Sequence, residues 1–169
     1  FAGDGGPATE AMLRGLAGQA APPTSRIVLD RNDNLYLADT FNNRIRKIGT
    51  DGIITTIAGT GFDFRMGGET DLGEYGPALS AALSWPCDIA LDAQDRLYIA
   101  DTFNHCIRRI EADGQIATVA GQCGVQGFAG DGGNPGVSLL NRPYGIDLDA
   151  DGNLYIADTK NQRIRVVYF

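Results

Sequence analysis

One phrase of this sequence is written three times, and that repetition limits the fold more than any single motif does. LYLADTFNNRIRKI occupies residues 35–48 and returns as LYIADTFNHCIRRI at 97–110 and as LYIADTKNQRIRVV at 154–167. A catalytic site is rarely written three times in one chain, whereas a structural unit often is. The repeated phrase is therefore interpreted first as a folding unit.

Each copy lies inside a larger unit of short segments with the composition of β-strands. An Ile/Val/Leu-rich segment ending in Asp precedes the phrase at 26–30, 88–92 and 145–149, and a β-branched segment follows it at 52–59 and 115–121. The phrase supplies a second strand that is apolar on both faces and must be covered on both sides. It also supplies a third strand interleaved with Arg and Lys, which suits a more peripheral position.

Turn-forming residues separate these segments. RNDN at 31–34, GTDG at 49–52 and EADG at 111–114 are rich in the Asn, Asp and Gly that tight turns require. Each unit is therefore predicted to be a four-stranded antiparallel meander. Several short strands would also suit a sandwich, but repetition of a complete meander favours the radial packing of a β-propeller.

The pattern G-(D/N)-L-Y-(I/L)-A-D-T-x-N-x-R-I-R-K-I, with GDGGPA before it at 3–8 and ITTIAGTG after it at 54–61, resembles the NHL repeat. The form is the one common in bacterial secreted and cell-surface proteins, and the resemblance extends over nearly the whole chain. It implies an all-β fold, an NHL-type β-propeller, with three four-stranded blades of a six-bladed ring.

The repeat divides one propeller domain into three parts. Residues 1–59 form the first blade with a leading loop, 60–121 the second blade with a long loop, and 122–169 a third blade without its fourth strand. Three blades cannot close a ring, and repeat units are unstable when unstacked. We expect the ring to be completed by further blades of the same chain, by a second copy, or by another protein.

An Asp ends the second strand of every unit, at Asp39, Asp101 and Asp158. Because each stands directly before a T-x-N-x turn, we expect it to accept backbone N–H bonds and to hold that turn. Aligned carboxylates near a propeller axis could instead bind Ca²⁺, which prefers several oxygen ligands. No cofactor is expected, and axial Ca²⁺ is the alternative.

The three cysteines are Cys87, Cys106 and Cys123, and the sequence has no C-x-x-C motif. Cys106 opens a third strand and Cys123 lies just past the fourth, so the hairpin between them favours a Cys106–Cys123 disulfide. Cys87 lies two strands from Cys106, beyond the usual Cα separation of a disulfide. Such a bridge would favour an extracellular, periplasmic or cell-surface setting.

The charge balance limits the partners. A net charge of −7 argues against nucleic acid and against an anionic membrane surface. No run of 18 apolar residues occurs, so direct membrane insertion is not expected.

Aromatic residues on or near the turns and long loops are the candidate ligand anchors, because loops on a rigid scaffold commonly carry binding sites. They are Trp85, Tyr75, Phe62, Phe64, Tyr144, Phe41 and Phe103.

The preferred function is a non-enzymatic propeller scaffold for protein, peptide or glycan binding and assembly in a secreted or cell-surface protein. One alternative is part of a propeller lyase or hydrolase with catalytic residues on blades outside this chain. A related lyase family holds zinc with several His, whereas this chain has only His105 and catalytic zinc needs about three protein ligands. No catalytic residue is assigned. The second alternative is a purely structural repeat module in a larger assembly.

Overall fold

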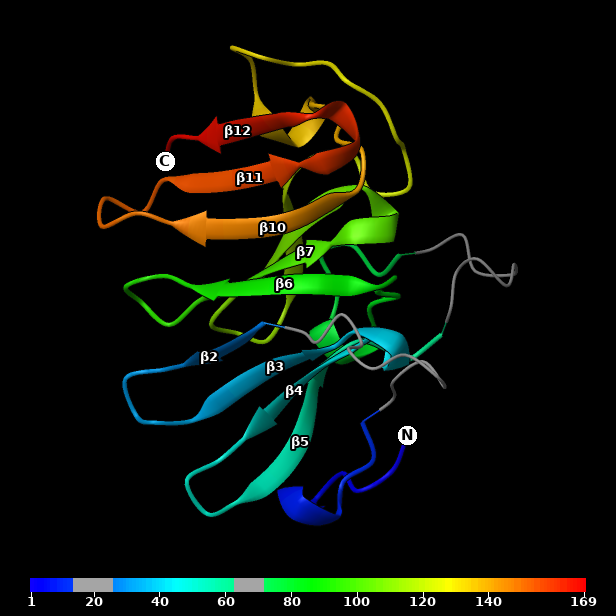
Figure 1. Cartoon of the computed structure of the whole chain (residues 1–169), viewed down its shortest axis with the longest axis vertical. Coiled ribbons are helices and arrows are strands. Elements are labelled where there is room, and N and C mark those ends of the chain that lie inside the picture. Colours follow the sequence, from blue (N-terminus) through cyan, green and yellow to red (C-terminus); the bar gives the residue numbers. More distant parts are fainter. Residues whose placement is uncertain (14–25, 63–71) are drawn as a thin grey trace.

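The computed structural model describes residues 1–13, 26–62 and 72–169, which form three antiparallel sheets packed side by side (Figure 1). The first sheet has the strand order β1-β5-β4-β3-β2, the second β6-β7-β8-β9 and the third β10-β11-β12. The predicted all-β, propeller-type fold is confirmed, and the three sheets do not close into a ring. In the described part of the chain, no helix is both long enough and apolar enough to cross a membrane.

The strands follow the predicted meander. Those of blade 1 are β2 Ile27–Leu29, β3 Leu35–Asp39, β4 Arg44–Ile48 and β5 Ile53–Ala58, with β1 Gly6–Pro7 added at the outer edge. Those of blade 2 are β6 Pro86–Leu91, β7 Leu97–Asp101, β8 Cys106–Ile110 and β9 Ile116–Ala120. Those of blade 3 are β10 Pro143–Leu148, β11 Leu154–Asp158 and β12 Arg163–Val167.

Short 3₁₀ helices interrupt the connections at equivalent places in the units. One set follows the second strand of each blade: η2 Thr40–Asn42, η5 Thr102–Asn104 and η7 Thr159–Asn161. The other set precedes the first strand at some distance: η1 Ala8–Glu10, η4 Ala78–Ser80 and η6 Pro135–Val137.

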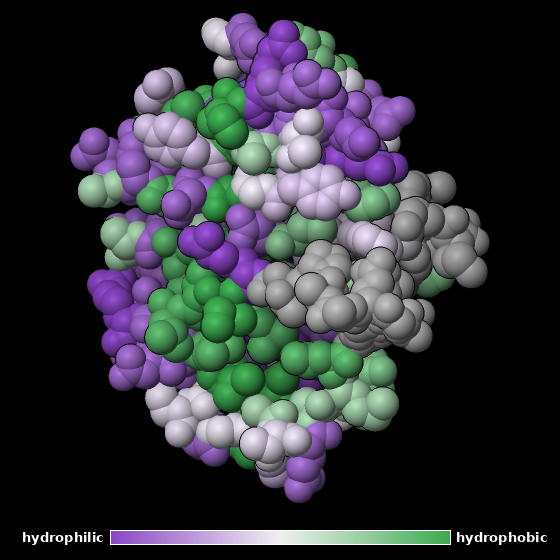
Figure 2. Space-filling view, in the orientation of Figure 1, coloured by the Kyte–Doolittle hydropathy of each residue, from purple (hydrophilic) through white to green (hydrophobic). Residues whose placement is uncertain are grey.

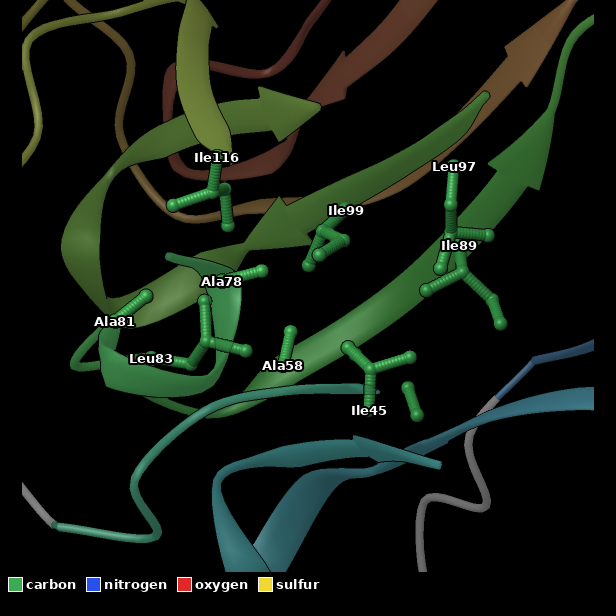
Figure 3. Close-up of a cluster of buried hydrophobic side chains, with 10 residues drawn as sticks. Ile45, Ala58, Ala78, Ala81, Leu83, Ile89, Leu97, Ile99 and Ile116 are labelled. Atoms are coloured by element: carbon green, nitrogen blue, oxygen red, sulfur yellow. The ribbon is translucent and has the colours of Figure 1, made fainter. Parts of the chain in front are cut away.

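The blades stack through two separate hydrophobic clusters, with the inner strands β2, β6 and β10 as neighbours. Figure 3 shows the cluster between blades 1 and 2, where Ile45 faces Ile89, Leu97 and Ile99. Tyr98 and Ala100, which alternate with Leu97 and Ile99 on β7, belong to the cluster between blades 2 and 3. The middle blade is thus buried on both faces, as its two-faced apolar strands predict.

The outer faces of blades 1 and 3 carry apolar side chains in solvent. On β2 the side chains of Ile27 and Leu29 are each 61% exposed, and on blade 3 Ile164 is 69% exposed. Figure 2 shows the apolar surface over β2 and β3. In the middle blade the equivalent Ile89 and Ile107 are buried and Leu91 is partly buried, so these faces have the composition of blade interfaces without a neighbouring blade.

A glycine-containing loop, here called the strap, precedes each blade; the straps are residues 3–8, 73–78 and 130–135. The first two lie along the fourth strand of their own blade: Gly5 N–H donates to the Ile54 carbonyl at 2.9 Å and Tyr75 N–H to the Ile116 carbonyl at 3.0 Å. Gly3 has φ +95°, and a Cβ there would lie 2.6 Å from Ala11 Cα, so the close approach of the first strap to Ala11 requires glycine.

Candidate binding face

The repeated Asp holds the junction between the second strand, the turn after it and the loop from the preceding blade. In blade 2 the buried Asp101 accepts bonds from Ser84 N–H at 2.8 Å and from Asn104 Nδ2 at 2.9 Å, and its Oδ2 lies 3.8 Å from Arg108 Nη1. Burial raises the pKa of Asp101 to about 6, although Arg108 and both hydrogen bonds act to lower it.

Equivalent bonds recur in the other two blades. Asp158 accepts from Asn141 N–H at 2.7 Å and from Asn161 Nδ2 at 2.8 Å, and Asp39 accepts from Asn42 Nδ2 at 2.8 Å. Each of these carboxylates is therefore bound by the Asn of its own turn, and Asp101 and Asp158 are also bound by the loop that precedes their blade. No cluster of three or more His, Cys, Asp or Glu side chains suited to a metal ion occurs among the described residues.

The Thr after this Asp ties one blade to the next. Thr40 Oγ1 donates to the Pro86 carbonyl at 2.7 Å, and Thr102 Oγ1 donates to the Pro143 carbonyl at 2.8 Å. Both acceptors open the inner strand of the following blade. The A-D-T-x-N-x-R phrase is thus the sequence of a blade junction.

The residue that ends each T-x-N-x turn has a left-handed backbone, with φ of +51° at Asn43, +60° at His105 and +57° at Gln162. Asn43 Oδ1 accepts from Trp85 N–H at 2.8 Å, and His105 Nδ1 accepts from Arg142 N–H at 3.1 Å. The histidine therefore takes over the acceptor role of the asparagine and requires an unprotonated Nδ1. Burial and the nearby Arg142 lower the pKa of His105.

These bonds place a row of aromatic side chains across the side of the molecule formed by the T-x-N-x turns and by the loops before β6 and β10, here called the loop face. This aromatic row consists of Phe41, Trp85 and Phe103, with Arg142 at its end. The Trp85 ring centroid lies 4.7 Å from that of Phe41 and 4.9 Å from that of Phe103, and Arg142 Cζ lies 4.3 Å from the Phe103 centroid. Offset and edge contacts between aromatic rings are favourable, as is a guanidinium over a ring face. The row joins blades 1, 2 and 3 on one side of the molecule.

The remaining predicted anchors differ in position. The Phe62 carbonyl accepts from Asn43 Nδ2 at 3.2 Å, so this residue lies beside the row. Tyr144 lies on β10 and is 38% exposed, and Tyr75 lies in the second strap, apart from the row, and is 72% exposed. Phe64 lies outside the described residues. Phe41 is only 8% exposed, so the accessible part of the row consists of Trp85, Phe103 and Arg142.

Sequence reasoning did not identify two polar residues that make contacts between blades, Arg142 on the loop face and Asp88 on an inner strand. Arg142 directly precedes Pro143 as Trp85 precedes Pro86, and this shared position was the signal that could have revealed it. Asp88 on β6 accepts from Ile146 N–H of β10 at 2.8 Å and so links two inner strands. Its equivalents in the other units are Arg26 and Gly145, so repetition gave no signal for it. Burial raises the pKa of Asp88.

The structure joins Cys106 and Cys123 in a disulfide across 17 residues, with the Cα atoms 5.0 Å apart. It connects the start of β8 to the loop after β9, as the hairpin geometry favours. Cys87 is a free, half-buried thiol that donates to the Trp85 carbonyl, with Sγ 3.3 Å from the oxygen.

The stacked meanders, their inner strands side by side and their repeated junctions define the class: a segment of a β-propeller. Residues 140–167, the third copy of the phrase with its inner strand, match the NHL repeat family. That match and the relatives below support an NHL-repeat family for this chain.

Teneurin-3 of Danio rerio is 32% identical over 167 residues, which are 96% of this chain and 6% of that protein. NHL repeat-containing protein 2 of Gallus gallus is 30% identical over 144 residues, 79% of this chain and 18% of that protein. A solved structure of a protein of unknown function from Bacteroides thetaiotaomicron is 28% identical with a TM-score of 0.66, over 79% of this chain and 32% of that one. The chain thus spans only a small part of each curated relative and about a third of that structure.

Proposed function

We propose that this chain is a non-enzymatic scaffold whose loop face binds a protein, peptide or glycan in a secreted or cell-surface protein. The observation that carries the proposal is the aromatic row, in which Trp85, Phe103 and Arg142 combine flat apolar surface with a cation. Aromatic and arginine side chains are the groups that most often dominate binding energy at interfaces. The repeated polar residues, in contrast, are occupied in blade junctions, as Asp101 and Thr102 show.

The proposed compartment, extracellular, periplasmic or cell-surface, rests on the Cys106–Cys123 disulfide, because reducing compartments rarely preserve such bridges. We include in this proposal that the repeat is of the form found in bacterial secreted proteins. Alkylation of the native protein without reductant, followed by mass spectrometry, should label Cys87 alone. Labelling of all three cysteines in freshly isolated material would contradict this setting.

The binding role can be tested with a built-in reporter, because Trp85 is the only tryptophan in the sequence. The protein is screened against peptide and glycan arrays, and each ligand found is titrated while Trp85 fluorescence is recorded. We expect saturable binding that changes this fluorescence and that weakens about tenfold in Arg142→Gln.

Tyr75→Ala serves as the matched control, since it removes an exposed aromatic side chain outside the row. Ligands that bind Arg142→Gln and the unaltered protein equally, without changing Trp85 fluorescence, would exclude the loop face. Arrays that yield no saturable ligand would contradict the binding proposal.

A further inference from the structure

A cavity of about 250 Å³, here called the open cavity, lies between blades 1 and 2 at the end of the sheets that carries the β6–β7 turn. Its apolar lining includes Tyr36, Ile57 and Ile110, which pack against the hydrophobic cluster between the two blades. The T-x-N-x turns lie at the opposite ends of these strands (Figure 1), so the open cavity is separate from the loop face. All four strands of both blades are described, so its walls do not depend on a missing blade.

The repeat aligns this cavity with an equivalent place between blades 2 and 3, here called the filled site. Tyr36 corresponds to Tyr98, and Lys47 corresponds to Arg109. Lys47 Nζ lies 5.3 Å from the centroid of the Tyr36 ring. Arg109 Cζ lies 5.6 Å from the centroid of the Tyr98 ring. Both places therefore combine a tyrosine with a cation over its ring.

The filled site receives a carboxylate and an aromatic ring from its own blades. Glu111 accepts a hydrogen bond from Arg109 Nε at 2.7 Å. The ring centroid of Phe169 lies 6.2 Å from that of Tyr98. Tyr98 is 1% exposed there, whereas Tyr36 is only partly buried.

The open cavity lacks both groups because smaller residues occupy the equivalent positions. Gly49 of blade 1 corresponds to Glu111, and Ala112 of blade 2 corresponds to Phe169. Ala112 lines the open cavity, but its methyl group is too small to take the place of a ring. The space beside Tyr36 and the uncompensated charge over it follow from these two residues.

Lys47 is the charge of this lining that is available to a ligand. The other charged side chains of the lining each form an ion pair: Arg96 with Asp92 at 2.6 Å, Asp95 with Arg31 at 3.0 Å, and Glu111 with Arg109. In the part of the chain that the structure describes, Lys47 forms none, and the Tyr36 hydroxyl beside it donates to Asp30 at 3.1 Å. An anionic group in the cavity would therefore meet an unpaired ammonium above apolar walls.

We propose that the open cavity binds a small aromatic carboxylate, whose ring packs beside Tyr36 and whose carboxylate pairs with Lys47. Such a ligand supplies the two groups that Glu111 and Phe169 supply in the filled site. Cavities for drug-sized ligands occupy about 300–1,000 Å³, so this one accommodates a single ring with a short chain rather than a peptide segment. The site does not depend on the binding role proposed for the aromatic row.

The test titrates the whole protein with 3-phenylpropionate and records amide chemical shifts. We expect saturable one-to-one binding with a Kd of about 1 mM, as is usual for a ligand of this size. The shift changes should concentrate at Tyr36, Lys47 and residues 94–97 and 110–112. 3-Phenylpropanol keeps the ring without the charge and should bind about fivefold more weakly. Butyrate keeps the charge without the ring and should not saturate at the same concentrations.

The charge contact is tested by a double-mutant cycle between the ligand carboxylate and Lys47. Lys47→Gln should weaken binding of the acid about fivefold and leave the alcohol unchanged, so the preference for the acid should disappear. A purely structural role of Lys47 would lower both affinities together. Lys160→Gln removes the same charge from an exposed turn of blade 3, outside this lining, and should leave both affinities unchanged.

Ala112→Phe tests the site in the opposite direction, because it supplies the ring that the filled site has at Phe169. Position 112 is exposed in the turn after β8, so the fold should remain intact. We expect this variant to bind neither the acid nor the alcohol. Ala112→Ser changes the same position without filling the cavity and should bind both as the parent does.

The proposal is overturned if 3-phenylpropionate shows no saturable binding, if the parent binds the acid and the alcohol equally, or if Ala112→Phe binds as well as the parent. Binding of a peptide with adjacent Phe and Glu residues, without binding of 3-phenylpropionate, would assign the cavity to a protein partner. That result would also overturn the proposal.

Discussion

His105 shows how one side chain couples a blade junction to pH. Its Nδ1 accepts the Arg142 N–H bond only while it is unprotonated, and its pKa is lowered in the folded protein. A histidine with a lowered folded pKa contributes stability above its unfolded pKa of about 6.5, and that stability is lost as the pH falls below this value.

We therefore expect His105→Asn to remove part of the acid sensitivity. Asparagine occupies the equivalent position at Asn43, tolerates the left-handed backbone and accepts the same kind of bond at every pH. The free energies of unfolding of both proteins are compared between pH 8 and pH 5. The variant should match or exceed the parent at pH 8 and should gain relative to it as the pH falls.

Asp101 titrates in the opposite sense and makes the comparison with the parent necessary. Its pKa is raised to about 6, so its contribution to stability falls as the pH rises from about 4 through 6. Both proteins share this effect, and the difference between them isolates His105. Parallel stability curves for the two proteins would contradict the role given to the histidine.

The roles of residues that recur in all units could be predicted from the sequence, and the roles of residues unique to one unit could not. Repetition indicated the turn positions of Asp39, Asp101 and Asp158, but it could not show that the following Thr reaches the next blade. That bond depends on the packing of two sheets, which no local pattern specifies. Asp88 has Arg26 and Gly145 as equivalents, so only the structure shows its bond to β10.

At the scale of elements, the hydrogen bond from the repeated Thr to the next blade can be tested with an internal control. Thr102 Oγ1 donates to the buried carbonyl of Pro143, whereas Thr159 Oγ1, in the outermost blade, donates to the Ala157 carbonyl of its own blade. Thr102→Val should lower the free energy of unfolding by about 1–3 kcal/mol, because it leaves a buried acceptor unpaired.

Thr159→Val makes the same change at an exposed position and should alter stability by about 0.5 kcal/mol or less. Urea unfolding followed by circular dichroism measures both variants. Equal losses in the two would show that the hydroxyl acts within its turn rather than between blades.

The strand positions could be predicted because four short apolar segments alternate with turn residues in each unit. The position of the straps could not be predicted in the same way. The GDGGPA sequence contributed to the resemblance to the NHL repeat, but the place of the strap along the fourth strand of its blade depends on backbone bonds such as Gly5 N–H to Ile54, made across almost a whole unit. Within the described residues, the connection at the start of the chain contains a single 3₁₀ turn, Ala8–Glu10.

At the scale of the whole molecule, the two uncovered blade faces determine how the isolated chain should associate. The blade 2 equivalent of Leu29 is the partly buried Leu91, and that of Ile164 is the buried Ile107. Exposed apolar patches such as those at Leu29 and Ile164 promote association. We expect the isolated chain to associate at micromolar concentration, with a light-scattering mass above 18.0 kDa.

Leu29→Glu and Ile164→Glu should each reduce this association, because either charge would have to be desolvated at the contact. Tyr75→Glu adds the same charge at an exposed site on the second strap and should leave the mass unchanged. A parent protein that remains at 18.0 kDa at all concentrations would contradict the expectation.

The pairing of each strap with the last strand of its own blade has a consequence for how such arrays can be rearranged. Gly6 and Pro7 pair with Ile54 and Ile53, and Pro77 pairs with Gln115, so the first and last segments of a unit clasp each other. A unit that is duplicated from its strap onward keeps the pairing between its strap and its fourth strand. A unit that begins at its inner strand would lose this pairing. The natural module for gene duplication, or for grafting into another array, therefore begins at the GDGG sequence.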